Sequence, residues 1–227
     1  MENLLDNPVY YALVSGDQDK GFGSEYVRAF VQEISPFAGF QEQLENGFEE
    51  LKQMLPPGRS ILFATRNEIN QPKGWRLMRH IHGSQFVFST RKTFDHFDAA
   101  IQPLNRQHIS QMIDLAALTK PGPFDIRTIE FGEYHGIFND NRLVAMTGQR
   151  LHTFYHTEIS AVCTHPDHLG KGYAASLLKH QIDKILTDGK IPFLHVRSDN
   201  KRAIEIYERL GFNYSGVMNF YFLENGS

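Results

Sequence analysis

The sequence predicts a mixed α/β fold, in which a mostly antiparallel sheet carries helices on its faces. Two observations lead to this prediction. Apolar runs typical of strands recur along the chain, and stretches with apolar residues at helical spacing separate several of them. In roughly the last seventy residues the two kinds alternate as strand, helix, strand, helix and strand. The predicted strands lie at 61–64, 85–88, 99–101, 137–138, 143–146, 158–164, 193–196 and 214–223.

In the first half, two helices are predicted. Ser24 is a suitable N-cap for a helix over 24–34, in which apolar residues recur at helical spacing. A second helix over 44–55 ends at the sequence Pro-Pro-Gly. The stretch 91–98 is the expected linker. We therefore divide the chain into an α/β segment, 1–96, and a larger domain, 97–227.

In the second half, three helices are predicted between the strands. The first carries apolar residues between 109 and 116 and cannot continue through the loop Pro-Gly-Pro-Phe at 121–124. The second has an apolar stripe over 174–185 and ends at Asp188-Gly189. The third covers 200–210, and an Asn-Asp-Asn turn at 139–141 joins two strands.

Composition excludes several classes of protein. The net charge of −3 gives no electrostatic footprint for nucleic acid or for an anionic membrane. The 227 residues contain no apolar run long enough to span a bilayer and no secretory signal at the N-terminus. A single cysteine fits a reducing compartment. We expect a cytoplasmic protein.

The most informative stretch is 162–174, where a strand leads through a loop into a helix that two glycines, Gly170 and Gly172, open. The first N–H groups of a helix lack intrahelical partners and carry the positive end of its dipole, so this turn suits a pyrophosphate. A dinucleotide fingerprint fits the glycines but not the five residues that separate them from the strand. The sequence required of a nucleotide P-loop is absent.

Two motifs resemble the GNAT superfamily of N-acetyltransferases. Residues 167–172, Asp-His-Leu-Gly-Lys-Gly, are similar to its cofactor motif Q/R-x-x-G-x-G/A, with Asp167 in place of Gln or Arg. The second signature, N-x-x-A-x-x-x-Y-x-x-x-G-F, is complete from Asn200 to Phe212. The resemblance covers about 97–223, and residues 136–146 and 157–166 look like the branch that contains glycine N-acyltransferase C-terminal domains. The first half is compatible with a degenerate copy of the same fold.

This resemblance implies a GNAT fold, with central parallel strands that splay apart to admit the pantetheine arm of acetyl-CoA. It also implies the residues that would hold this cofactor: Val162, Cys163, Thr164, Leu169, Gly170, Lys171, Gly172, Tyr173, Ala174, Asn200, Ala203 and Tyr207. A backbone N–H near Val162 would face the thioester oxygen.

Glu158 and Tyr207 are the candidate catalytic residues. Strand alternation would place Glu158 on one face with Ser160, Val162 and Thr164, where its carboxylate could take a proton from the attacking amine. A structural alternative for Glu158 is pairing with a nearby arginine. Helical spacing would place Tyr207 on one face with Asn200 and Ala203, as the acid for the departing thiolate. A core tyrosine is the alternative there.

The remaining expectations concern the acceptor and the mechanism. Phe124 and Glu158 are expected to bind the substrate, a primary amine of a small molecule, which attacks acetyl-CoA directly. Cys163 is expected to point away from Glu158 as a small hydrophobic side chain, and no metal site is expected, since the histidines lack partners at a ligand spacing. A non-catalytic acyl-CoA binder, or an acyltransferase for longer chains, stays open, as does a homodimer.

Overall fold

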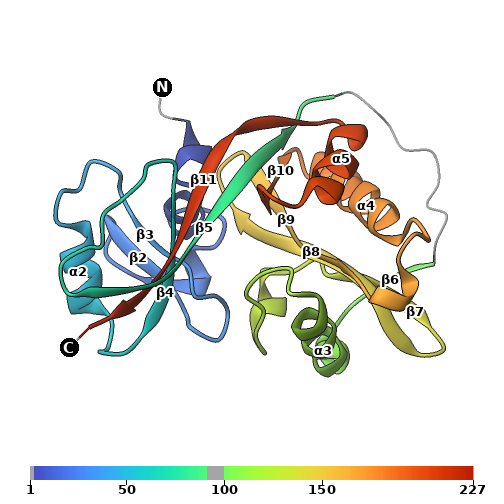
Figure 1. The fold of residues 1–227 in the computed structure, drawn as a ribbon, viewed down its shortest axis with the longest axis horizontal. Helices are drawn as coiled ribbons and strands as arrows, with labels where there is room; N and C mark the ends of the chain where they lie inside the picture. The colour runs from blue at the N-terminus through green and yellow to red at the C-terminus, as the bar shows by residue number, and fades with distance from the viewer. Residues whose placement is uncertain (1–2, 91–99, 227) are drawn as a thin grey trace.

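The computed structural model describes residues 3–90 and 100–226, and its strands form two sheets (Figure 1). A small antiparallel sheet contains β1 (Gly21–Gly23), β2 (Val27–Phe30) and β3 (Ala38–Phe40). The large sheet contains β4 (Ser60–Thr65), β5 (Trp75–Phe88), β6 (Ile101–Pro103), β7 (His135–Asn139), β8 (Arg142–His152), β9 (His156–Thr164), β10 (Ile191–Arg197) and β11 (Phe212–Asn225). The helices are α1 (Pro8–Leu13), α2 (Gly47–Met54), α3 (Ile109–Thr119), α4 (Tyr173–Thr187) and α5 (Lys201–Leu210), with 3-10 turns at Leu4–Asp6, Gln18–Lys20, Arg106–His108, Thr128–Phe131 and Pro166–His168.

The large sheet has the order β4-β11-β5-β10-β9-β8-β7-β6. Among the described strands of this sheet, β9 and β10 form the one parallel pair, and every other neighbouring pair is antiparallel. This arrangement confirms the predicted mixed and mostly antiparallel sheet.

Strands β5 and β11 connect the two halves of the molecule as one long twisted ribbon (Figure 1). They pair from Phe212↔Phe88 to Asn225↔Trp75. One end of the ribbon pairs with β10 through β5, and the other end pairs with β4 through β11. The predicted linker 91–98 and the boundary between 96 and 97 lie outside the described residues. Strands from both sides of that boundary share one sheet.

Helices cover both faces of the strands that surround the parallel pair. On one face, Leu178 and Ile182 of α4 pack with Leu210 of α5 against Ile159 and Leu194 of the sheet. Helix α3 lies on the opposite face (Figure 1). Its residues Met112, Leu115 and Ala116 belong to a second core with Met146, Ala161 and Cys163. No helix within 3–90 or 100–226 is both long and apolar enough to cross a membrane.

The predicted helix over 24–34 is wrong, because residues 27–30 form β2. The hydroxyl of Ser24 accepts hydrogen bonds from the N–H groups of Tyr26 and Val27, and so closes the turn between β1 and β2. Val27 and Phe30 pack into two different cores rather than along one helical stripe. The other predicted helices are confirmed with small changes in their ends, and the strand expected near 99–101 is observed at Ile101–Pro103.

Candidate active site

The parallel strands β9 and β10 separate partway along their length. They pair at three positions, the last of which joins Phe193 to Glu158. Beyond this point β9 continues to Thr164 with only β8 beside it, while β10 continues to Arg197 with only β5 beside it. The backbone groups that face the gap between them are therefore available to a bound molecule. The predicted splayed strands are confirmed.

A β-bulge interrupts β9 at Ala161, whose φ of 53° lies in the left-handed region. Gly148 pairs with Ser160 and Met146 pairs with Cys163, so two residues of β9 face the single residue Thr147. An extra residue reverses the alternation of side chains beyond it.

The bulge overturns the expected grouping of side chains on β9. Val162 packs with Ile159 on the α4 side of the sheet, rather than on the face of Glu158. Cys163 packs with Ala161 on the α3 side, so the prediction that it points to the face opposite Glu158 was also wrong. Burial raises the pKa of the Cys163 thiol to about 11, despite a hydrogen bond with Thr119. This thiol therefore stays protonated at neutral pH.

A cavity of about 800 Å³ lies at the gap between β9 and β10 and extends beneath α3. This volume is typical of a site for a small molecule. Five of the predicted site residues border it: Phe124, Glu158, Val162, Asn200 and Tyr207. The fold thus brings together side chains from the α3 loop, from β9 and from α5.

Glu158 is buried in this cavity wall, with 1 % of its side chain exposed, and it is held by an arginine and a histidine. Arg150 donates to it through Nε and Nη2 over 2.8 Å and 2.9 Å, and His195 Nδ1 lies 2.7 Å from Oε1. Burial alone would raise the pKa of Glu158. The charge of Arg150 and the hydrogen bond from His195 outweigh that effect and lower the pKa to about 2. The structural alternative raised from the sequence, pairing with an arginine, is therefore what the geometry shows.

A chain of buried polar groups extends from Glu158 to the N-terminal segment. Gln85 donates from Nε2 to the carbonyl of Leu5 and lies 3.0 Å from His195 Nε2. Its Oε1 accepts a hydrogen bond from Arg66, which also pairs with Asp6. Because the amide of Gln85 is fixed from both sides, its Nε2 is the donor to His195. The His195 proton therefore lies on Nδ1, facing Glu158.

Tyr207 has a different environment. Its ring packs between Phe86 and Phe212, and burial raises the pKa of its phenol to about 12. Among the described residues no side chain or backbone group forms a hydrogen bond with its hydroxyl. Tyr207 borders the cavity, so this hydroxyl is a protonated donor beside open space.

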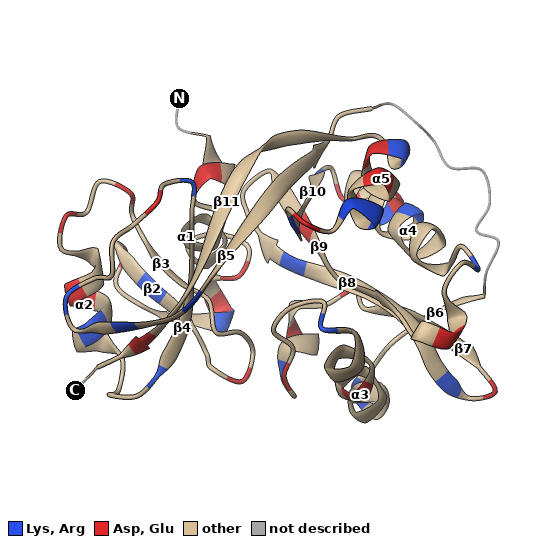
Figure 2. Ribbon diagram, in the orientation of Figure 1, with Lys and Arg blue, Asp and Glu red and all other residues tan. Residues whose placement is uncertain are grey.

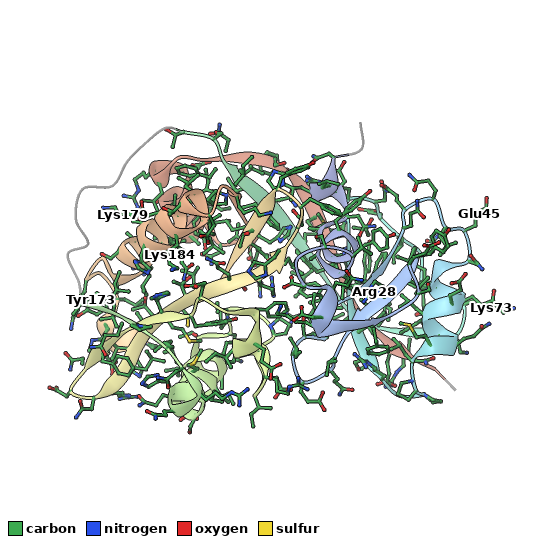
Figure 3. All side chains as sticks on the ribbon, turned by 180° about the vertical axis from the view of Figure 1, so that it is seen from behind. Arg28, Glu45, Lys73, Tyr173, Lys179 and Lys184 are labelled. Carbon is green, nitrogen blue, oxygen red and sulfur yellow. The ribbon has the colours of Figure 1, made fainter. Side chains whose placement is uncertain are left out.

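The glycine turn lies at the start of α4, at the end of the molecule where Figure 3 labels Tyr173. Gly170 and Gly172 have φ values of 81° and 77°, and a Cβ on either would meet open space. Gly172 is the N-cap, and no described side chain caps the helix. Lys171 extends beside His168, with Nζ 3.3 Å from Nδ1. The turn therefore offers uncapped N–H groups and one cation to an anionic ligand.

The remaining predicted cofactor residues lie around these two places. Leu169 precedes the turn, and Ala174 is in the first turn of α4. Asn200 caps α5 by accepting from the N–H of Ala203, and Ala203 packs half-buried on α5. Thr164 ends β9. Within 3–90 and 100–226, no three His, Cys, Asp or Glu side chains are grouped to hold a metal ion.

Sequence reasoning missed Arg150, His195 and Gln85 as parts of this site. Arg150 could have been found from the sequence. A hairpin with its tip near residue 154 places residue 150 opposite residue 158, and the structure shows Arg150 paired with Glu158 in this way. For His195, the parallel neighbour strand was predicted but its register with β9 was not. Gln85 lies far from the motifs in the sequence, and nothing local marks it.

Comparison with known proteins finds similar sequences in the second half of the chain. The model of a family described as FR47-like protein matches residues 134–221. A ribosomal protein bS18-alanine N-acetyltransferase of Salmonella typhimurium is 37% identical over 62 residues, which are 27% of this chain and 42% of that protein. A spermidine N(1)-acetyltransferase of Vibrio cholerae is 39% identical over 64 residues, 27% of this chain and 36% of that protein. The chain thus matches about two fifths of the length of these relatives.

The fold matches a solved structure over its whole length. That structure, from Novosphingobium aromaticivorans, is described as belonging to the GNAT family, and it superposes with a TM-score of 0.90 at 29% identity, covering 100% of both chains. The range matched by the family model, 134–221, includes the splayed strands and the glycine turn. Together these findings support a GNAT superfamily N-acetyltransferase.

Proposed function

We propose that this protein transfers an acetyl group from acetyl-CoA to a primary amine of a small molecule. The observation that carries the proposal is the gap between β9 and β10, which opens into a cavity bordered by both Glu158 and Tyr207. A carboxylate and a protonated phenol on the two sides of one gap supply the two proton-handling groups that acyl transfer to an amine requires.

The residues at the glycine turn fit the cofactor. Uncapped N–H groups at the start of α4, together with Lys171, would hold its pyrophosphate, since they combine the helix dipole with a positive charge. Open space at Gly170 and Gly172 lets the backbone approach closely. The unpaired edge of β9 after Glu158 would hold the pantetheine arm as an added strand. Bound there, acetyl-CoA supplies the acetyl group as a thioester.

The bulge at Ala161 suggests how the reacting carbonyl is stabilised. It breaks the regular ladder between β8 and β9, so the N–H near Val162 is a candidate donor into the gap. A fixed N–H donor that faces a developing oxyanion contributes about 3 kcal/mol to transition-state stabilisation.

Glu158 would orient the amine. Its Oε1 already faces His195 and Arg150, whereas Oε2 receives one hydrogen bond from Arg150 and retains a free lone pair. Transfer forms a C–N bond and breaks a C–S bond, and one proton must leave the amine. With a pKa of about 2, Glu158 holds that proton only transiently and passes it through water to solvent.

Tyr207 would serve the other end of the reaction. Its protonated hydroxyl donates a hydrogen bond to the departing sulfur, which receives the electron pair of the broken C–S bond. A thiolate buried in the same gap also has a raised pKa, because desolvation disfavours its charge. The pKa values of the Tyr207 phenol and of the departing thiol therefore lie closer together in the gap than the phenol's raised value would lie to that of a thiol in water, which favours proton transfer between them.

Calorimetric titration with acetyl-CoA tests the cofactor assignment. We expect binding with a dissociation constant on the order of micromolar for the wild type, and its loss in Gly170→Glu. Gly189→Glu is a matched control, because Gly189 also has a positive φ and open space around its Cβ but lies beyond the other end of α4. Absence of binding to the folded wild type contradicts the proposal. Binding without thiol release on a panel of amines indicates a non-catalytic acyl-CoA binder instead.

A further inference from the structure

The part of the cavity beneath α3 has an apolar wall built from distant segments of the chain. Phe37 comes from the N-terminal segment, Ile81 from β5, Phe220 from β11 and Phe124 from the α3 loop. Phe124 packs edge-to-face on Tyr134, with ring centroids 5.8 Å apart. This wall lies away from the glycine turn, so it faces the acceptor rather than the cofactor pyrophosphate. An acceptor with a bulky apolar group would bury that group here.

The charged groups of the same cavity are mostly cationic. Glu158 is the one carboxylate among the described residues that border it, and the charge of Arg150 already balances its own. Arg79 and Lys120 also border the cavity and form no ion pair with any described residue. A polyamine would therefore bring further positive charge to a site without a spare carboxylate. Elsewhere, acidic and basic residues are interspersed over both halves of the molecule (Figure 2).

Arg150 is the cation whose geometry is fixed most firmly. Its side chain is 11 % exposed, and its guanidinium carbon lies 4.8 Å from the centre of the Phe37 ring. Nε and Nη2 are used by Glu158, whereas no described residue forms a hydrogen bond with Nη1. The edge formed by Nη1 and the second N–H of Nη2 is thus a held pair of donors, with the spacing that suits a carboxylate.

These observations deepen the function proposed above and depend on it. We infer that the acceptor is an apolar α-amino acid of aromatic or branched type. Its carboxylate binds the free edge of Arg150, its side chain packs against Phe37, Phe124 and Phe220, and its amino group faces Glu158. Arg150 is then a specificity-determining residue for the acceptor, in addition to the partner of Glu158.

Thiol release with four acceptors tests this assignment on the wild-type protein. L-phenylalanine carries all three recognition groups, 2-phenylethylamine lacks the carboxylate, glycine lacks the apolar side chain, and spermidine lacks both. We expect kcat/KM for L-phenylalanine to exceed that for each of the others at least tenfold. Preference for 2-phenylethylamine or spermidine overturns the inference and leaves the acetyltransferase proposal intact. Binding of acetyl-CoA with turnover of none of the four also overturns it, whereas absence of acetyl-CoA binding overturns the proposed function itself.

A variant separates recognition by Arg150 from its structural role. Arg150→Lys retains the positive charge but loses the pair of donors. Without that pair, we expect the preference for L-phenylalanine over 2-phenylethylamine to fall toward one. A structural defect would instead lower both rates by the same factor and leave the preference unchanged. Arg76→Lys, at an exposed ion pair with Glu224, should leave the preference unchanged. An unchanged preference in Arg150→Lys contradicts the assignment. If that variant fails to fold, the comparison of the four acceptors on the wild-type protein still tests the assignment.

Discussion

The pair of Arg150 and Glu158 gives the sharpest test of the electrostatics of this site. A pKa lowered from 4.5 to about 2 means that the folded protein favours the ionised carboxylate by roughly 3 kcal/mol at neutral pH. Glu158→Gln removes this charge and leaves the guanidinium of Arg150 buried without its counter-ion. We expect the free energy of unfolding to fall by about 3 kcal/mol, within the range known for breaking a buried pair.

Urea-induced unfolding, followed by circular dichroism at pH 7, measures this change. Glu224→Gln is the matched control, because it breaks a pair with Arg76 whose side chains are 62% and 27% exposed, and it should cost less than about 1 kcal/mol. The double variant Arg150→Met with Glu158→Gln removes the unpaired cation as well, so it should lose less stability than the sum of its single variants. Equal losses in Glu158→Gln and Glu224→Gln would refute the reasoning.

The same pair predicts a dependence on pH. Because the folded pKa of Glu158 lies below its ordinary value, its contribution is complete above about pH 4.5 and is lost as the pH falls toward 2. The difference in stability between wild type and Glu158→Gln should therefore stay constant from pH 8 to about pH 5 and shrink below it. A difference that changes between pH 6 and pH 8 would show that another group titrates in its place.

Three further predictions concern neighbouring groups. Tyr207→Phe should lower kcat at least about a hundredfold with little change in stability, because no described residue forms a hydrogen bond with its hydroxyl. The hydroxyl of Tyr221 accepts a hydrogen bond from a backbone N–H, so Tyr221→Phe should lower the stability and leave kcat nearly unchanged, as measured by urea unfolding and thiol release. Gln85→Met should destabilise the protein by about 1–3 kcal/mol in urea unfolding, since the Leu5 carbonyl and His195 lose their donor; an unchanged midpoint would mean that water replaces it. Cys163 should react with a thiol reagent only after unfolding, given its burial and a pKa of about 11, and rapid labelling of the native protein would contradict this.

The second half of the fold could be predicted from the sequence because its local signals agree with its tertiary packing. The apolar stripe of α4 recurs at helical spacing and is buried at Leu177, Leu178, Ile182 and Ile185, and two glycines open the helix where the motif places them. Asn200 both begins the second motif and caps α5. Where one pattern satisfies propensity, capping and burial together, sequence reasoning gives the right element.

The errors arose where tertiary contacts override local pattern. Val27, Phe30 and Ile34 are spaced as in a helix, yet they reach separate cores from a strand and a turn. On β9, alternation predicts the correct face for Glu158 but fails beyond Ala161, because no residue type in that stretch announces a bulge. The partners of Glu158 come from two other strands, and pairing register is a property of the assembled sheet.

The position of β11 limits how this molecule can be assembled. β4 and β5 do not pair with each other, since β11 lies between them. Until residues 212–225 are in place, both strands present unpaired edges, and Phe220 is missing from the apolar wall of the cavity. A chain growing from its N-terminus therefore completes its first half only after almost all of its second half has been synthesised. The large sheet and the wall of the cavity become complete in the same late step, so a partly made chain has neither a continuous sheet nor a complete cavity.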